Sequence, residues 1–485
     1  MSPHIPRLSP FAPVPQARQP KLRLPLPAAL LALAAAAALS ACGGSGGATD
    51  TPAPPAPAPA PKLALALPGV AALKLRTEGT LWVAMTEKPH GFMDVTVMER
   101  RLEFSDAADA RANAWSPPQG WTLVDFALHP QRQVSAVLSN GTSLRLVRLD
   151  DKGGQLAMQD FRDPAVAQDP WFAGQGELRD RSAMSPSKTR DAARLAPAGE
   201  HLGLALRTGA NAVVAYRFDY ANGRFTQRWR TLVEPGIHLD AVRPTSGSYD
   251  PFEGADNHWK LAMDMDGRGR MAVGVLVSNR SDLAFAHRQV FDEPLPAGLA
   301  DGVLLTVLDE RGVRSPAVAV DNRDKSELHA LKWAGETVLL AGRVRTGRSA
   351  DGAGWDGYVA RAGGAAGAIS HRLVDVDRGD VILDLLPLDG SAVLLAGATG
   401  YTQNPGGESV SESSAPLLAR FDTATGAISR IALTAGPRGN QVRALGSYRA
   451  RWLTGGMENV PGTHSADADP RLLTVDGYLR EVDPR

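Results

Sequence analysis

The sequence has a single cysteine among its 485 residues, Cys42, so a disulfide framework and a cysteine-rich zinc site are both excluded. Basic and acidic residues are equal in number, at 52 each, and this lack of net charge argues against nucleic acid as a partner. The sequence contains neither a zinc-type His-Glu-x-x-His motif nor a Walker phosphate loop. We therefore expect no cofactor and no metal site, and we consider an enzyme less favoured than a binding protein.

The chain also lacks an apolar run long enough to span a bilayer. The longest such stretch is Leu24 to Leu39, about sixteen residues, whereas a spanning helix needs roughly twenty. Basic residues precede it, and the small residues Ser40 and Ala41 follow it, just before Cys42. A basic segment, a short apolar segment and a small-residue junction are typical of a secretory signal peptide.

The junction Leu39-Ser40-Ala41-Cys42 resembles the lipobox of bacterial lipoproteins. This resemblance implies that residues 1–41 are a lipoprotein signal peptide and that Cys42 becomes the lipidated N-terminus, with several acyl chains as a membrane anchor. Gly43 in place of aspartate then implies the outer membrane, facing the periplasm or exposed at the surface. The alternative is an ordinary cleaved signal with an incidental cysteine.

Residues 42–67 are rich in glycine, then in alternating proline and alanine, and have almost nothing to bury. Proline-rich chain forms a semi-rigid polyproline II rod of about 3.1 Å per residue, so we expect a tether that reaches on the order of 60 Å. The remaining residues, 68–485, contain no second linker and are expected to form one domain.

This domain contains an internal repeat. Gly342 and Gly397 occupy matching places 55 residues apart, and two Gly-Ala-Ile-Ser blocks begin 59 residues apart, at Gly367 and Gly426. Each unit shows alternating apolar strands separated by an Asp-and-Gly turn, without a helical pattern. One unit predicts four strands, at 327–332, 337–344, 356–362 and 368–376.

Four antiparallel strands that repeat in this way predict an all-β fold, a β-propeller of about seven four-stranded blades. Six or eight blades are the alternatives. The seven units begin near Val70, Trp121, Arg194, Trp259, Glu327, Val381 and Gln441.

The segment LAMDMDGRGRMAVGVLVSN, residues 261–279, resembles the repeats of bacterial seven-bladed propeller proteins in its order of strand, Asp-Gly turn and strand. A calcium loop that begins at Asp264 is less favoured than a hairpin turn, because Arg268 and Val275 stand where two oxygen ligands are required. The last unit ends after three strands, so we expect its fourth strand to come from the N-terminal segment KLALALPGVAALKL.

In propellers of this kind, the connections from second to third strand and from blade to blade emerge on one face. The three long connections, 163–191, 234–258 and 280–301, map to that face, and such loops often carry recognition. The candidate binding residues are aromatic and charged side chains in these connections and at nearby strand ends: Trp171, Phe172, Arg207, Tyr249, His258, Arg280, Arg343, Arg345, Tyr401 and Glu458, with Phe252, Phe291 and Asn459 beside them.

Aromatic residues with arginines around a shallow funnel suit a glycan, an anionic small molecule or a peptide, and we expect a protein or glycan partner. The alternative for each residue is that it packs a connection onto the propeller. The sequence therefore favours an envelope-anchored, non-catalytic binding or scaffolding lipoprotein. The alternative function is a propeller hydrolase or lyase that acts on an envelope polysaccharide. Carboxylates grouped within about 5 to 10 Å at the central funnel would favour that enzyme.

Overall fold

The structure is a computed structural model. It describes residues 63–88, 99–105, 111–140, 143–161, 193–207, 212–235, 261–278, 287–288, 290–294, 301–321, 326–346, 354–363, 369–377, 379–400, 414–433, 439–458 and 476–482. These residues all belong to one compact unit, Pro61–Arg485. Cys42 and the expected signal peptide and tether lie outside them, apart from the end of the tether after residue 62. Within the described part of the chain, no helix combines the length and hydropathy needed to cross a membrane.

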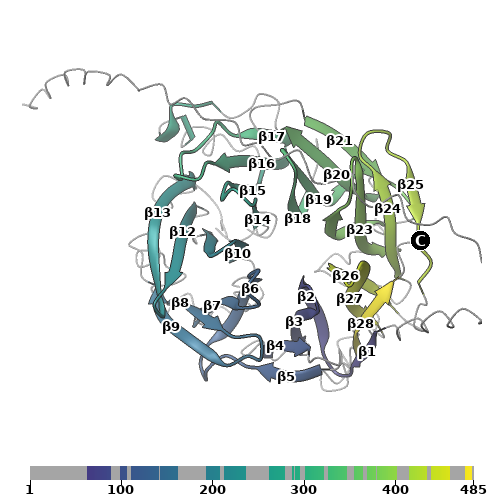
Figure 1. Ribbon diagram of the computed structural model, residues 1–485. Coiled ribbons are helices and arrows are strands. Elements are labelled where there is room, and N and C mark those ends of the chain that lie inside the picture. Colours follow the sequence, from purple (N-terminus) through teal and green to yellow (C-terminus); the bar gives the residue numbers. More distant parts are fainter. Residues whose placement is uncertain are drawn as a thin grey trace, which may run out of the picture. The chain divides into compact units, whose positions relative to one another are not determined.

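The described strands form seven antiparallel sheets of four strands, arranged as blades around a centre (Figure 1). This arrangement confirms the predicted seven-bladed β-propeller. The first three blades are β2 (Ala71–Glu78), β3 (Leu81–Lys88), β4 (Glu99–Ser105) and β5 (Arg111–Trp115); β6 (Thr122–Leu128), β7 (Val134–Ser139), β8 (Leu144–Leu149) and β9 (Gln155–Phe161); and β10 (Ala193–Ala198), β11 (His201–Arg207), β12 (Val213–Ala221) and β13 (Arg224–Glu234).

The next three blades are β14 (Leu261–Met265), β15 (Met271–Ser278), β16 (Asp301–Leu308) and β17 (Val318–Asp321); β18 (Ser326–Ala334), β19 (Thr337–Arg345), β20 (Trp355–Gly363) and β21 (Ile369–Val374); and β22 (Val381–Pro387), β23 (Ala392–Thr399), β24 (Ala415–Asp422) and β25 (Ile428–Arg430). The seventh contains β26 (Gln441–Tyr448), β27 (Arg451–Glu458), β28 (Asp476–Val482) and β1 (Ala64–Leu67). The first strands begin within two residues of the predicted unit starts.

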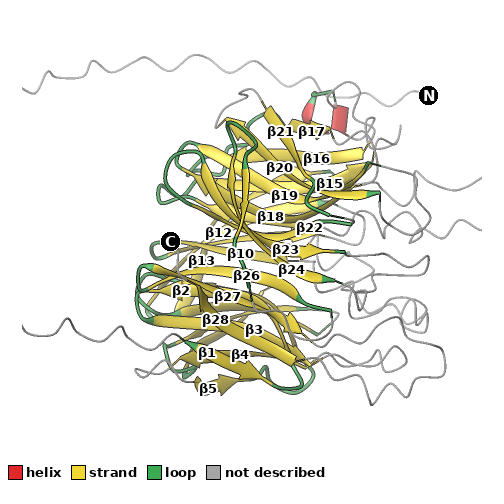
Figure 2. Cartoon of the chain, turned by 90° about the vertical axis from the view of Figure 1, so that its right-hand side faces the viewer, coloured by secondary structure: helices red, strands yellow, loops and turns green. Residues whose placement is uncertain are grey.

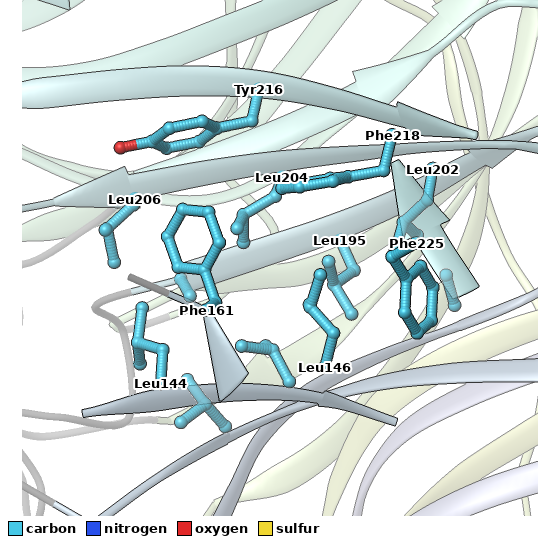
Figure 3. Close-up of a cluster of buried hydrophobic side chains, with 14 of the residues drawn as sticks. Leu144, Leu146, Phe161, Leu195, Leu202, Leu204, Leu206, Tyr216, Phe218 and Phe225 are labelled. Carbon is cyan, nitrogen blue, oxygen red and sulfur yellow. The ribbon is translucent and has the colours of Figure 1, made fainter. Parts of the chain in front are cut away.

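Side chains are more buried on the inner strands of a blade than on its outermost strand, because neighbouring blades pack face to face. The second strand β23 is buried along its whole length, whereas the outermost strand β25 is exposed throughout. Apolar side chains fill the space between blades. Between the second and third blades, Phe161 meets Tyr216 edge to face, with ring centroids 4.9 Å apart (Figure 3).

The Asp-and-Gly turns recur as predicted. In the hairpin between β16 and β17, Asp309 Oδ1 accepts hydrogen bonds from the backbone N–H groups of Arg311 and Val313, at 2.9 and 2.8 Å. Gly312 takes a φ of 80°, which favours glycine. Asp150, Asp266 and Asp422 make equivalent bonds in their own turns. The hairpin interpretation of residues 264–270 is thus confirmed.

The two ends of the domain pair in the seventh blade, which confirms the predicted closure. Strand β1 lies antiparallel to β28, with Leu67 opposite Gly477. The backbone N–H of Leu63 donates to the Glu481 carboxylate at 3.1 Å, and the N–H of Glu481 donates to the Leu63 carbonyl at 2.9 Å. The N-terminal strand therefore completes the last sheet and closes the ring.

Candidate functional site

The ring has two faces that differ in their connections. We name the side at which the second strands end and the first strands begin the loop face. The three long connections join β9 to β10, β13 to β14 and β15 to β16, so all three leave and rejoin the blades at the loop face. The opposite side carries the short hairpins between first and second strands and between third and fourth strands, drawn green in Figure 2.

Most of the candidate binding residues lie outside the described residues. Arg207 is the last residue of β11, and its side chain is not described. The residues outside are Trp171, Phe172, Tyr249, Phe252, His258, Arg280, Tyr401 and Asn459. Their proposed roles stay predictions.

Arg343 lies at the loop face near the end of β19, but it is only 1% exposed. Its Nη2 donates to Glu327 Oε1 at 2.8 Å, and its guanidinium lies 4.7 Å from the ring centroid of Trp355. Glu327 also contacts His329 Nε2 at 2.9 Å. A buried arginine paired in this way holds three strands of the fifth blade together, so any contact with a partner requires this cluster to open.

Two further candidates, Arg345 and Glu458, end second strands at the loop face and are half-buried. Glu458 accepts hydrogen bonds from Arg480 Nη2 on both carboxylate oxygens, at 2.8 and 2.9 Å. Arg480 also lies over the ring of Tyr478, with 4.3 Å from guanidinium carbon to ring centroid. Glu458 thus belongs to a charged cluster at the seventh blade.

Phe291 packs onto the propeller, as the alternative for the aromatic residues expected. Its ring lies 4.0 Å from the guanidinium carbon of Arg314 and 5.0 Å from the ring of His287. His287 is fully buried, and its Nε2 lies 3.5 Å from Glu234. Burial lowers the pKa of His287, but the hydrogen bond and charge of Glu234 outweigh it, so the pKa is raised. This cluster anchors a helical turn to the fourth blade.

Sequence reasoning missed a group of three aspartates at the loop face. Asp356 is the second residue of β20, Asp375 directly follows β21, and Asp380 directly precedes β22. Each offers a carboxylate oxygen, and these oxygens all lie within 4.8 Å of one another. The acidic run DVDRGD, residues 375–380, was the available signal, but spacing alone does not bring Asp356 to it.

The innermost strand of each blade contributes to a set of charged residues whose sign alternates around the ring, except between the seventh and first blades. The first strands carry Lys74, Asp125, Arg194, Asp264, Lys332, Asp384 and Arg443 in ring order. Lys74 pairs with Asp125, and burial lowers the pKa of this lysine while Asp125 opposes the shift. Some of these charges are therefore already paired within the ring.

The three aspartates of this set each tie their own blade to the next one, and we name them the interblade aspartates. Asp125 accepts from the backbone N–H of Leu195 at 2.8 Å. Asp264 and Asp384 make the same bond to Trp333 and Leu445, at 3.0 and 2.9 Å. The centre therefore presents single aspartates with structural roles, and the three-aspartate group lies instead at the seam between the fifth and sixth blades.

One serine–histidine contact also bears on catalysis. His129 Nε2 lies 2.9 Å from Ser135 Oγ, the distance of a base from a nucleophile. Both residues are fully buried, and Arg148 Nη1 donates to the same oxygen at 2.9 Å. A substrate has no access to this pair, so it is a structural contact between the second blade and the turn at Gly199.

No protein-family model matches the chain, and no curated protein matches it. Solved structures are similar in fold. The β-propeller domain of the Trilobed protease from Pyrococcus furiosus is 12% identical, with a TM-score of 0.40, over 80% of this chain and 90% of that one. An acylaminoacyl peptidase from Pyrococcus horikoshii is 10% identical, with a TM-score of 0.45, over 86% of this chain and 51% of that one.

A third similar structure is YCF48 bound to a D1 peptide, which is 9% identical, with a TM-score of 0.43, over 87% of this chain and 95% of that one. The chain spans about half the length of two further peptidases that it matches, 46% of a prolyl endopeptidase and 49% of an uncomplexed acylaminoacyl peptidase from Pyrococcus horikoshii. Similarities at this level carry no information about activity. The β-propeller is established by the seven four-stranded sheets of the structure itself.

Proposed function

We propose that this chain is an outer-membrane lipoprotein that binds or scaffolds a protein or glycan partner through the loop face and performs no catalysis. The supporting observation is that charged side chains have different roles in different parts of the ring. At the centre, aspartates accept interblade hydrogen bonds, and at the hairpin face aspartates accept hydrogen bonds from the backbone of their own turns. At the loop face, Arg343, Glu327 and Trp355 of the fifth blade form a charged and aromatic cluster, and the three long connections leave the second to fourth blades on the same face.

Partner capture tests the binding role. The full-length chain is used as bait in an envelope extract, beside Trp171→Ala and Arg345→Ala, which alter the loop face. Arg343→Ala is less suitable, because it leaves Glu327 without its buried guanidinium partner. Arg311→Ala is the matched control, since Arg311 is exposed in a hairpin turn of the opposite face.

We expect Trp171→Ala and Arg345→Ala to reduce capture while the control captures as the unchanged chain does. Equal capture by all variants would remove the loop face from the proposal.

Membrane anchoring is tested at Cys42. If Cys42 carries the lipid, Cys42→Ala releases the protein from the membrane fraction in a carbonate wash, because the anchor is lost. Ser40→Thr keeps the cysteine and serves as the control. Retention of the Cys42→Ala protein in the washed membranes would contradict the lipoprotein proposal.

One observation favours the alternative, a hydrolase or lyase acting on an envelope polysaccharide: carboxylate oxygens of Asp356, Asp375 and Asp380 lie within 4.8 Å. Glycosidic cleavage uses two carboxylates about 5 to 10 Å apart across the bond. Here two of the three residues are on or next to the outer strands β20 and β21, away from the centre. Turnover of an envelope polysaccharide that is lost in Asp375→Asn would establish the enzyme in place of the binding protein.

A further inference from the structure

We propose that Asp356, Asp375 and Asp380 bind a divalent cation with hard-ligand preference, Ca²⁺ by size, at the seam between the fifth and sixth blades. This site is independent of the partner-binding role proposed above. The juxtaposition arises from the ring: β20 and the end of β21 belong to one blade, and Asp380 begins the next. The backbone N–H of Asp380 donates to the Trp355 carbonyl at 2.9 Å, which holds the start of β22 against the start of β20.

The spacing of the oxygens suits a calcium ion. Ca²⁺ takes oxygen ligands at about 2.3–2.6 Å, so ligands on opposite sides of the ion stand about 5 Å apart. All three carboxylates offer an oxygen within 4.8 Å of the others. Carboxylate oxygens, with no histidine or cysteine in the group, select Ca²⁺ or Mg²⁺ over zinc or copper. The irregular arrangement of strand and loop residues favours Ca²⁺, because Mg²⁺ demands near-ideal octahedral geometry.

A second observation points to a ligand: two buried oxygens at this site lack partners. Asp380 is fully buried, and its Oδ2 accepts from the backbone N–H groups of Val376 and Asp377, at 2.6 and 3.1 Å. Its Oδ1 makes no hydrogen bond, and neither does the hydroxyl of Thr399, which is 2% exposed. A buried carboxylate oxygen without a hydrogen-bond partner is costly, and a bound cation would satisfy it.

Charge balance supports the same conclusion. Within the described part of the chain, several buried or half-buried acidic residues of the ring have cationic partners, for example Asp125 with Lys74 and Asp266 with Arg270. Asp356, Asp375 and Asp380 form no ion pair with a described residue. A divalent cation would neutralise this concentration of negative charge.

The neighbouring residues orient the carboxylates. Thr346 Oγ1 donates to Asp356 Oδ2 at 2.5 Å, which leaves Oδ1 of Asp356 for the ion. A bound ion would join the third strand and the end of the fourth strand in one blade to the first strand of the next. It would therefore stabilise the seam and organise the loop face there.

The test measures Ca²⁺ binding and thermal stability of the purified full-length chain after treatment with EDTA. Calcium chloride should raise the melting temperature in a concentration-dependent manner, because a ligand that binds only the folded state stabilises it by mass action. Isothermal titration should give one site. Asp375→Asn, an exposed position, should weaken Ca²⁺ binding by at least about tenfold, because affinity follows the number of charged ligands.

Asp389→Asn is the matched control, since Asp389 is exposed in a turn of the sixth blade on the hairpin face. It removes the same charge and should bind Ca²⁺ as the unchanged chain does. Asp380→Asn should abolish the stabilisation, and Asp375→Asn keeps the test valid if that buried change prevents folding. No response to Ca²⁺ in the unchanged chain, or an undiminished response in Asp375→Asn, would overturn the proposal.

Discussion

His129 is a buried imidazole whose protonation state is set by its surroundings. Its Nδ1 lies 3.0 Å from the Gly199 carbonyl and its Nε2 lies 2.9 Å from Ser135 Oγ. Burial and the nearby charge of Arg148 lower the pKa of His129 to about 4. The folded protein therefore holds a neutral histidine at neutral pH, while the unfolded chain has the ordinary value of 6.5.

This difference predicts a loss of stability in acid. As the pH falls from 6.5 to about 4, the unfolded chain binds a proton that the folded protein excludes, so the free energy of unfolding decreases by on the order of 3 kcal/mol. His129→Gln removes this titration and should give a flatter dependence, with lower stability at pH 7. Urea denaturation over this pH range measures both slopes, and equal slopes would contradict the assignment.

Three matching glycines lie at one place in the second strands of the last three blades. A Cβ at each would overlap with a backbone carbonyl oxygen at the start of the first strand: Gly342 with Glu327, Gly397 with Val381, and Gly456 with Gln441. Gly397→Ala should therefore destabilise the protein by on the order of 3 kcal/mol, the upper end for overpacking. Thermal denaturation measures this, with Gly267→Ala as the control because nothing lies near its Cβ position. A cost equal to the control's would contradict the steric explanation.

At the scale of the element, the first strands are tied to one another by the interblade aspartates. In the sixth blade, Asp384 Oδ2 accepts from the Leu445 N–H of the seventh blade at 2.9 Å, and its Oδ1 accepts from Leu385 N–H. The bond joins two strands that belong to different sheets. This hydrogen bond therefore adds a directional polar contact where the rest of the contact between the blades is apolar.

Asp384→Ala should lower the free energy of unfolding by about 1–3 kcal/mol, because it leaves a half-buried backbone N–H without its acceptor. Asp384→Asn should cost less, since its amide oxygen can still accept one bond. Chemical denaturation compares both with Asp389→Ala, which removes an exposed aspartate from the same blade. Equal losses for Asp384→Ala and Asp389→Ala would show that the interblade bond contributes nothing.

At the scale of the whole molecule, closure depends on contacts between the two ends of the domain. The bond from Leu63 to Glu481 joins residues 418 positions apart. Closing so long a loop carries an entropic cost that the seventh blade must offset. Deleting residues 476–485 removes β28 and leaves β1 without its partner.

This truncated chain should lose the cooperative thermal transition of the ring, measured by circular dichroism. Deleting only residues 483–485 leaves β28 complete and should preserve that transition. If the longer truncation melted as the unchanged chain does, the closure would have no role in stability.

The sequence by itself determined the elements of this protein. Alternating apolar residues specify strands, Asp and Gly specify the hairpins through side-chain caps and positive φ, and the 55 to 59 residue recurrence specifies the blades. The strand and hairpin signals are local and can be read within one repeat, and the recurrence needs only the comparison of neighbouring repeats. The unpaired third strand of the last unit even predicted the partner segment near the N-terminus.

The tertiary structure alone decided how side chains from different strands meet. Arg343 was expected at a binding surface, but packing of the fifth blade places it in a buried pair with Glu327. Asp356 and Asp380 come together because the ring sets the start of β22 beside the start of β20. Contacts across a seam depend on the rotation between blades, which no spacing within a repeat encodes. The distances between the carboxylates of Asp356, Asp375 and Asp380 therefore follow from the ring and not from their separation in the sequence.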